Sequence, residues 1–333
     1  MKARLIVSSC YDWETTDPEL ERLKPEVEVF RCPEGRQLTE AEMIGYLSGT
    51  HYTLSADDPF NERVIRSAPS LQMINCDGVG VDHINLPVAT ECGVIVNNAP
   101  VVDDSNGEFA VGLIVALLRK IIIADKGVRS GEWHDRVRFA GYDLQGKTLG
   151  LLGFGRVAKA FAKRISGFDM NVTAYCRKPD RSTAEALGVT LVGLDELIER
   201  SDILSLHVTL TDLTRGMIGA EEIGRMKTGA YLMNTSRGAV VDEAALVDAL
   251  NSGKLSGAAL DVFDGEPPKL DNPLLHMENV VLAPHLGTET FQTFRRAFRS
   301  VVDDILLLRA GKRPGNVVNV DVLNHDRWKD LNA

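Results

Sequence analysis

The chain has 333 residues, of which 44% are hydrophobic and 25% charged, so it is long enough for two domains with substantial cores. Its formal net charge of -10 argues against a protein that binds nucleic acid or anionic membranes. No apolar run reaches the roughly 18 residues of a membrane span, so we expect no membrane partner either.

The cysteines and the N-terminus predict a cytoplasmic protein. The cysteines are odd in number, widely spaced and without a Cys-x-x-Cys pair, so we expect reduced thiols and no metal site. The first residues, MKARLIVSSC, enter a strand-like run and show no signal-peptide pattern. The cysteines are Cys10, Cys32, Cys76, Cys92 and Cys176.

Strand-like and helix-like segments alternate over the first hundred residues, which predicts a parallel α/β sheet. After the fourth strand, Gly78-Val79-Gly80 can expose backbone N–H groups to a carboxylate, although on this stretch alone an ordinary loop is the simpler interpretation. The expected strands are Arg4–Ser8, Val27–Arg31, Tyr52–Ala56, Leu71–Cys76 and Gly93–Asn97, and the expected helices include Thr39–Ser48 and Asn61–Ser67.

Two segments then connect the halves of the chain. Ser105 and Glu108 have the spacing of a capping box, and apolar residues continue to Ile123, which predicts one long helix from Ser105 to Ile123. The polar and aromatic stretch Gly127–Asp143 lacks periodicity and predicts an extended arm.

The segment from Lys147 to Lys163, KTLGLLGFGRVAKAFAK, has the order strand, glycine turn, helix. Gly153, Gly155 and Ala158 occupy the three small positions of the dinucleotide fingerprint G-x-G-x-x-G/A. The first permits a sharp turn, the second lets backbone N–H groups approach a pyrophosphate, and the third lets the helix pack closely. With strand and helix both present, the segment favours dinucleotide binding over an ordinary tight turn.

A second glycine-rich run, from Gly141 to Thr148, matches the P-loop pattern G-x-x-x-x-G-K-[ST]. A P-loop follows a strand and opens a helix, whereas Lys147-Thr148 begins a predicted strand. We therefore reject nucleoside triphosphate binding at this run.

From Lys147 onward, six strand candidates alternate with helical segments, which predicts a second doubly wound sheet. The fold class expected for the whole chain is therefore α/β, with two doubly wound parallel-sheet domains. The expected strands are Lys147–Leu152, Asn171–Cys176, Ile203–Val208, Ala230–Asn234, Gly257–Val262 and Val280–Ala283.

Polar residues follow the last three of these strands, and we expect Arg237, Glu266 and His285 to face one crevice outside the carboxyl ends. Taken singly, Arg237 is better explained as a surface cation, Glu266 as a turn residue and His285 as a core histidine. Together, beside a nucleotide fingerprint, they suit hydride transfer to a carbonyl. The histidine can donate the proton, the carboxylate can orient it, and the guanidinium can hold a substrate carboxylate by two hydrogen bonds.

These motifs together resemble the D-isomer-specific 2-hydroxyacid dehydrogenase family over nearly the whole chain. The resemblance implies a Rossmann cofactor domain of residues 101–287, inserted into a flavodoxin-like substrate domain of residues 1–100 and 288–333. It also implies an oxidoreductase for small 2-keto and D-2-hydroxy acids, usually a homodimer to which the arm contributes. The motifs are Gly78-Val79-Gly80-Val81-Asp82, Gly153-Phe-Gly155-Arg-Val-Ala158, Asn234-Thr235-Ser236-Arg237-Gly238, Ala259-Leu260-Asp261-Val262-Phe263, Asp264-Gly265-Glu266-Pro267 and Ala283-Pro284-His285.

The resemblance further implies individual roles. Arg237 would bind the substrate carboxylate and polarise its carbonyl, His285 would be the general acid/base, and Glu266 would pair with it. The Val79-Gly80 backbone would help to hold the carboxylate, and Asp261 would contact the nicotinamide carboxamide. The implied cofactor contacts are Gly153, Gly155, Arg156, Val157, Cys176, Arg177, Lys178, His207, Val208, Thr235 and Asp261.

The residues at the end of the predicted strand Asn171–Cys176 bear on the choice between NAD and NADP. NAD-specific proteins of this fold carry an acid about 20 residues after the fingerprint, which binds the ribose hydroxyls. Here Cys176 holds that place, and Arg177 and Lys178 follow. Because no acid repels a 2′-phosphate and two cations can attract it, we expect NADP to be preferred over NAD. The alternative is that the two cations form a solvated loop pair.

Two other functions of the same fold compete with this one. Formate-dehydrogenase-like enzymes carry Gln where Glu266 stands, which argues against them. A non-enzymatic dinucleotide-sensing regulator remains an alternative, because its site can look intact. The segments Tyr52–Phe60 and Asp77–Gly80 are expected to select the substrate side chain, but nothing in them names the acid or the physiological direction.

Overall fold

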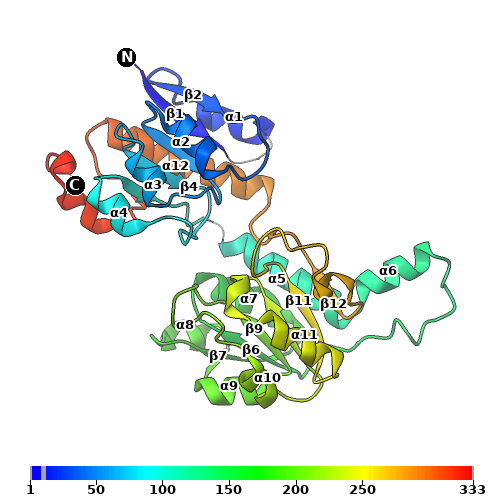
Figure 1. The fold of residues 1–333 in the computed structure, drawn as a ribbon. Coiled ribbons are helices and arrows are strands. Elements are labelled where there is room, and N and C mark those ends of the chain that lie inside the picture. Colours follow the sequence, from blue (N-terminus) through cyan, green and yellow to red (C-terminus); the bar gives the residue numbers. More distant parts are fainter. Residues whose placement is uncertain (1, 9–12, 102, 332–333) are drawn as a thin grey trace. The chain divides into compact units, whose positions relative to one another are not determined.

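The computed structural model describes residues 2–8, 13–101 and 103–331 (Figure 1). The chain divides into unit 1, Met1–Val102 with Glu289–Ala333, and unit 2, Asp103–Thr288. Cys10 lies outside the described residues, and the other four cysteines are free thiols. Within the described residues, no helix has the length and apolar character needed to cross a membrane, and no cluster of side chains has the composition of a metal site.

Unit 1 is built on a five-stranded parallel sheet within the described residues, in the order β2-β1-β3-β4-β5. This is the flavodoxin-like order and confirms the expected fold class. All residues of β3 and β4 are buried, as expected when helices cover both faces of a sheet. The strands are β1 (Ala3–Val7), β2 (Val27–Arg31), β3 (Tyr52–Ser55), β4 (Met73–Cys76) and β5 (Ile95–Asn97).

The helices of unit 1 lie on the two faces of its sheet. The segment around α1 packs with α12 on one face, while α2, α3 and α4 pack on the other. Thr39 caps α2 through a capping box with Glu42, as its sequence spacing favours. The helices are α1 (Trp13–Glu21), α2 (Glu40–Leu47), α3 (Glu62–Arg66), α4 (Leu86–Glu91) and α12 (Phe291–Arg309).

Unit 2 contains a seven-stranded parallel sheet within the described residues, in the order β12-β11-β10-β9-β6-β7-β8. The strand order reverses between β6 and β9, which is the switch point of the Rossmann fold. The strands are β6 (Thr148–Leu152), β7 (Asn171–Tyr175), β8 (Thr190–Leu191), β9 (Ile203–Leu206), β10 (Ala230–Asn234), β11 (Leu255–Leu260) and β12 (Val280–Leu282). The helices are α5 (Asp103–Leu118), α6 (Ile121–Arg129), α7 (Arg156–Ile165), α8 (Arg181–Ala186), α9 (Leu194–Arg200), α10 (Ala220–Arg225) and α11 (Glu243–Asn251).

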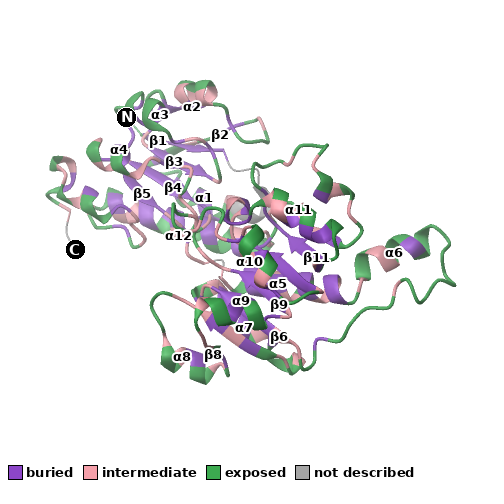
Figure 2. Ribbon diagram, turned by 60° about the horizontal axis from the view of Figure 1, so that its bottom comes forward, coloured by how far each residue is buried: buried purple, intermediate pink, exposed green. Residues whose placement is uncertain are grey.

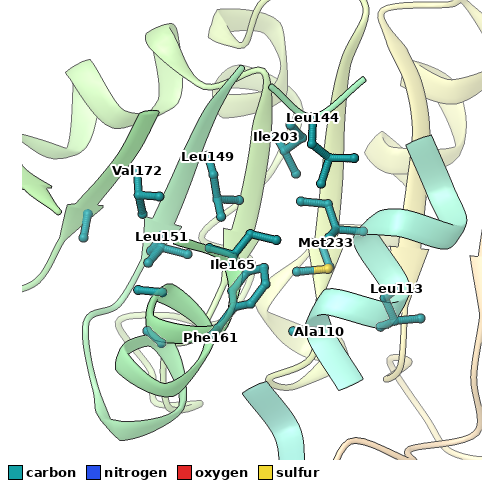
Figure 3. Close-up of a cluster of buried hydrophobic side chains, with 14 of the residues drawn as sticks. Ala110, Leu113, Leu144, Leu149, Leu151, Phe161, Ile165, Val172, Ile203 and Met233 are labelled. Carbon is teal, nitrogen blue, oxygen red and sulfur yellow. The ribbon is translucent and has the colours of Figure 1, made fainter. Parts of the chain in front are cut away.

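The glycine fingerprint is held by a dense core under α7 (Figure 3). Phe161 and Ile165 point from α7 toward Leu149 and Leu151 of β6, and Leu113 approaches from α5. Burial of each large apolar side chain stabilises the unit by about 1.5–3 kcal/mol, so this packing fixes the N-terminus of α7 beside β6.

The expected helix from Ser105 to Ile123 is wrong in two respects. The helix α5 begins at Asp103, so Ser105 lies inside it and does not cap it. It ends at Leu118, and Lys120, with φ of 53°, separates it from α6. The returning arm explains this break, because the Tyr142 N–H donates to the Leu118 carbonyl at 2.9 Å and takes the place of an intrahelical donor.

The arm itself is mostly exposed and extends away from the sheet of unit 2 (Figures 1 and 2). Phe139 packs tightly against Gly127, so that a Cβ at Gly127 would lie 2.2 Å from the Phe139 ring. Before the fingerprint, Lys147-Thr148 runs directly into β6 and not into a helix, which agrees with the rejection of a P-loop.

Candidate active site at the carboxyl edge of unit 2

The glycine turn after β6 requires Gly153 for two reasons. Its φ of 95° is a left-handed conformation that favours glycine. A Cβ there would also lie 2.5 Å from the carbonyl oxygen of His207, at the end of the neighbouring strand β9. Only glycine therefore allows β6 and β9 to meet so closely at the switch point.

The next positions leave room for a phosphate at the N-terminus of α7. Gly155 is the N-cap, and among the described residues no side chain caps the helix and no atom lies within 4 Å of the position that a Gly155 Cβ would take. Arg156 begins the helix and its Nε lies 3.2 Å from Asp103 Oδ2, and Val157 is half-buried. Ala158 is fully buried against the sheet. The free helix N–H groups and the open space fit a pyrophosphate.

The segment after β7 carries two exposed cations. Cys176 is half-buried, and its Sγ lies 3.4 Å from the Lys178 carbonyl oxygen. Arg177 and Lys178 are exposed, and the ion pair found in this part of the described chain joins Lys159 to Asp180 and includes neither of them. Their side chains are therefore available to an external anion.

The next acid along the chain, Asp180, is bonded to groups of the protein itself. Its Oδ1 accepts the Thr183 N–H at 3.2 Å as the N-cap of α8, and its Oδ2 lies 2.5 Å from Lys159 Nζ. Hydrogen bonds from Lys159 and Thr183 hold the pKa of Asp180 far below its usual range. This carboxylate is thus committed to α7 and α8.

Two buried polar atoms near the switch point have no hydrogen-bond partner among the described residues: Nδ1 of His207 and Oγ1 of Thr235. The other His207 nitrogen, Nε2, lies 2.7 Å from Ser205 Oγ. Burial lowers the pKa of His207 to about 4, so the ring is neutral at neutral pH. Val208 follows and is half-buried, with its Cγ1 beside Gly153.

Arg237 follows β10 on a turn shaped by Asn234. The Asn234 Nδ2 donates to the Arg237 carbonyl at 2.9 Å, and its Oδ1 accepts the Ser236 N–H at 3.0 Å and the Ser236 hydroxyl at 2.8 Å. A Cβ on Gly238 would lie 1.8 Å from the Phe263 carbonyl carbon, so glycine is required for this turn to pack against the segment after β11.

Glu266 and His285 form a direct pair. The His285 Nδ1 lies 2.8 Å from Glu266 Oε2, while Glu266 Oε1 accepts the Phe263 N–H at 3.0 Å. Burial raises the pKa of Glu266, but the hydrogen bond and charge of His285, with smaller contributions from Phe263 and Arg237, lower it overall. The carboxylate therefore stays ionised beside the imidazole, and the contact fixes the Nδ1 side of the His285 ring toward Glu266.

Asp261 holds the turn on which His285 lies. His285 has a φ of 57°, unusual for a side-chain-bearing residue, and its N–H donates to the Asp261 carbonyl at 2.8 Å. The Asp261 carboxylate, 1% exposed, accepts the N–H groups of Leu286 at 2.7 Å and Gly287 at 2.8 Å. Burial raises the pKa of Asp261, although these two hydrogen bonds oppose the rise.

In unit 1, the loop after β4 carries Val79 and Gly80, the residues expected to hold a carboxylate. The Asn98 Nδ2 donates to the Val79 carbonyl at 2.9 Å, and the Ala99 N–H donates to the Gly78 carbonyl at 3.0 Å. Val79 is 39% exposed. The loop is thus fixed by the segment that follows β5.

The structure therefore brings Arg237, Glu266 and His285 together within unit 2, and it places the fingerprint glycines at the switch point of the same sheet. Sequence reasoning missed the positioning roles of Asn234 and Asn98. Asparagine at the last position of a strand (Asn234) or immediately after one (Asn98) was the available signal, because its side chain readily bonds nearby backbone groups.

The residues present fit a nicotinamide dinucleotide. The uncapped N-terminus of α7 fits its phosphates, and the buried unpartnered atoms of His207 and Thr235 fit its polar groups. The glycine turn leaves the open space beside Gly155 that a dinucleotide phosphate needs.

Comparisons with known proteins agree with this geometry. The family model "D-isomer specific 2-hydroxyacid dehydrogenase, NAD binding domain" matches residues 111–287. A glyoxylate reductase from Korarchaeum cryptofilum is 42% identical over 270 residues, which cover 80% of this chain and 81% of that protein. A D-3-phosphoglycerate dehydrogenase from Methanocaldococcus jannaschii is 42% identical over 297 residues, covering 89% of this chain and 55% of that protein.

Structural similarity extends over nearly the whole chain. The crystal structure of a glyoxylate reductase from Paecilomyes thermophila matches with a TM-score of 0.84 and 30% sequence identity, covering 96% of this chain and 99% of that chain. The matched model, the relatives and the fold all point to one family. The chain belongs to the D-isomer-specific 2-hydroxyacid dehydrogenases.

Proposed function

We propose that the protein is a 2-keto acid reductase for small 2-keto acids, with glyoxylate as the first substrate to test. Family membership supports nicotinamide-dependent oxidoreduction of 2-hydroxy and 2-keto acids as its chemistry. The observation that carries the proposal is the 2.8 Å contact between His285 Nδ1 and Glu266 Oε2 in the same unit as the fingerprint. Glyoxylate is suggested by the names of the curated relatives.

In the proposed mechanism, each side chain has a separate task. The bound nicotinamide supplies the hydride. Arg237 binds the substrate carboxylate with its planar guanidinium and polarises the adjacent carbonyl. Nε2 of His285 gives its proton to the carbonyl oxygen, while Glu266 stabilises the positive charge of the imidazolium before that transfer. The Val79-Gly80 backbone is proposed to assist in carboxylate binding, and Asp261 is proposed to meet the carboxamide.

NADPH is the proposed cofactor. Cys176 offers no negative charge to repel a 2′-phosphate, and the exposed Arg177 and Lys178 are without acidic partners in the described structure. The commitment of Asp180 to Lys159 and to the N-terminus of α8 supports the same choice, since it cannot readily serve the ribose hydroxyls.

Steady-state assays test this function directly. Glyoxylate, hydroxypyruvate, pyruvate and 3-phosphohydroxypyruvate should each be assayed with NADPH and with NADH. Turnover of glyoxylate or another small 2-keto acid is expected. A protein that binds the dinucleotide but turns over none of them would instead be the non-enzymatic sensor that the sequence leaves open.

We also propose that the protein is a homodimer joined through the arm. Large apolar side chains are exposed along α6 and the segment after it, whereas a monomer rarely exposes so many together. Light scattering coupled to size exclusion tests this, and Trp133→Ser with Val137→Ser should shift the chain toward the monomer. The exposed residues are Ile121, Ile122, Val128, Trp133, Val137 and Tyr142.

A further inference from the structure

Unit 1 contains a cavity of about 350 Å³ at the amino ends of its strands. Ala3 and Tyr52 begin β1 and β3, Gln72 immediately precedes β4, and all three line the cavity. The expected carboxylate-binding loop, which contains Val79, follows the opposite end of β4. The cavity is therefore distinct from the loop that the family resemblance assigns to substrate.

Two arginines bring positive charge to this cavity. Arg309 lines it and pairs with Glu26, with Nε 2.6 Å from Oε2. Arg327 lies beside it, its guanidinium carbon 5.4 Å from the centroid of the Trp328 ring that lines the cavity. Glu26 balances the charge of Arg309, and it does not pair with Arg327.

Arg327 bonds to two backbone carbonyl oxygens. Its Nη1 donates to the Leu71 carbonyl at 2.5 Å and its Nη2 to the Ser70 carbonyl at 3.3 Å. Over the described ranges, no carboxylate forms an ion pair with it, and burial lowers its pKa. A half-buried charge without a counter-charge is costly, so an anion beside Arg327 would stabilise the unit.

His51 is a further polar residue of the cavity wall. It lines the cavity, and its Nδ1 accepts the Arg4 backbone N–H at 3.2 Å. Burial, followed by the charges of Arg327 and Arg309, lowers the pKa of His51. The ring therefore stays neutral, because both guanidinium groups disfavour a positive charge on it.

Hydrogen-bond donors complete the site. The Tyr52 hydroxyl donates to Gln72 Oε1 at 3.1 Å, which leaves the Gln72 amide N–H groups for another acceptor. Leu308 and Trp328 supply apolar walls. We propose that this cavity is a binding site for a small oxyanion, a carboxylate or a phosphate, held by Arg309, Arg327 and Gln72.

Calorimetric titration of the full chain with inorganic phosphate and with malonate, each at matched ionic strength, tests the site. Saturable binding with one anion per chain is expected from at least one probe. Phosphate alone would identify a phosphate site, malonate alone a carboxylate site, and both a general oxyanion site. The highest probe concentration is about 20 mM, roughly 20 times that of a physiological anion. If neither probe binds saturably up to that concentration, the proposal is overturned.

Variants locate the bound anion. Gln72→Glu keeps the acceptor for Tyr52, removes the donors and adds a negative charge, so binding should weaken at least about tenfold. Arg309→Gln should do the same, and Arg63→Gln, which removes a charge that is 78% exposed elsewhere in unit 1, should change nothing. Keto acid turnover by Gln72→Glu confirms that it folds. Binding that survives both cavity variants but is lost in Arg237→Lys would place the anion at the candidate active site and overturn the proposal.

Discussion

The Nδ1 of His285 lies 2.8 Å from Oε2 of Glu266, and the other oxygen of that carboxylate accepts the Phe263 N–H at 3.0 Å. The carboxylate is thus fixed at one oxygen by the backbone and presents the other to the imidazole. Because the pKa of Glu266 is lowered, its negative charge persists where it favours the protonated ring. This arrangement orients the imidazole ring of His285, and we propose its Nε2 as the proton donor.

The first prediction concerns that atom. His285→Ala should lower kcat by about 10²–10⁴-fold, because general acid catalysis is lost, while the dissociation constant of NADPH changes little. Steady-state kinetics and fluorescence titration measure the two quantities. His276→Ala, which alters an exposed histidine of the same unit, is the control and should leave kcat unchanged. A near-normal kcat in His285→Ala would remove His285 from the mechanism.

The second prediction concerns the substrate carboxylate. Arg237→Lys retains the charge but cannot form two parallel hydrogen bonds, so KM for glyoxylate should rise by about tenfold or more. Arg225→Lys is the matched control, because Arg225 pairs with Asp195 and Glu199 on the surface of unit 2. An unchanged kcat/KM for Arg237→Lys contradicts carboxylate binding by this residue.

Much of the fold could be predicted because it depends on local patterns. Ala230–Asn234 is an apolar run of strand length, and the structure has a strand with the same bounds. The two-residue strand β8 was missed because Thr190–Leu191 is too short to show a pattern. The break at Lys120 was missed because it depends on the distant N–H of Tyr142, which no local periodicity encodes.

The candidate site was predictable in outline for a different reason. Parallel strands place their carboxyl ends at one edge, so the approach of Glu266 to His285 follows from topology. The left-handed conformation of His285 and the use of both Asp261 oxygens by Leu286 and Gly287 were not predictable. They depend on how closely β11 and the turn after β12 pack.

The third prediction tests this turn. In the unmodified protein, each Asp261 oxygen accepts one backbone N–H. In Asp261→Asn, the side-chain NH₂ group would replace one of these acceptors and face a backbone N–H, which should lower the free energy of unfolding by about 1–3 kcal/mol. Displacement of His285 should lower kcat more than it raises KM. Urea unfolding and kinetics measure these effects.

Asp242→Asn provides the comparison. Asp242 also accepts two backbone N–H groups, but through one oxygen at the N-cap of α11, where Asn serves equally well. Its stability and kcat should therefore remain near those of the unmodified protein. Equal effects of the two substitutions would show that Asp261 has no special role in the turn.

The fourth prediction concerns stability against pH. The Glu19 side chain of α1 is 5% exposed and lies 2.9 Å from Arg299 Nη2 of α12 and 3.0 Å from Arg22 Nη1. Burial raises the pKa of Glu19, but hydrogen bonds from Arg299 and Arg22 lower it overall. A carboxyl with a lowered folded pKa stabilises the protein above its unfolded pKa, near 4.3, and this contribution is lost as pH falls through the folded pKa.

Glu19→Gln should therefore lower the free energy of unfolding by about 1–3 kcal/mol at pH 7, and the difference should shrink below about pH 4. Urea unfolding at several pH values measures it. Glu21→Gln, which removes an exposed partner of Lys24 from the same helix, should cost less than about 1 kcal/mol. A difference for Glu19→Gln that does not vary with pH would contradict the ionic origin of its stabilisation.

The fifth prediction concerns the choice between NADPH and NADH. Arg177 and Lys178 are exposed after β7, Cys176 holds the place of the usual acid, and Asp180 is bound to Lys159. Arg177→Ala should raise the KM for NADPH by about tenfold to a hundredfold, since a charge-assisted contact to the 2′-phosphate is worth about 1.5–3 kcal/mol, and should leave KM for NADH nearly unchanged.

Cys176→Asp makes the complementary change, because a carboxylate there would repel the 2′-phosphate and accept hydrogen bonds from the ribose hydroxyls of NADH. Its ratio of kcat/KM for NADPH over NADH should fall by more than about tenfold. Arg181→Ala, at the start of α8, is the matched control for loss of a neighbouring charge. A clear preference of the unmodified protein for NADH, or equal losses for both cofactors in Arg177→Ala, would refute phosphate recognition by this segment and leave the two cations as a solvated pair.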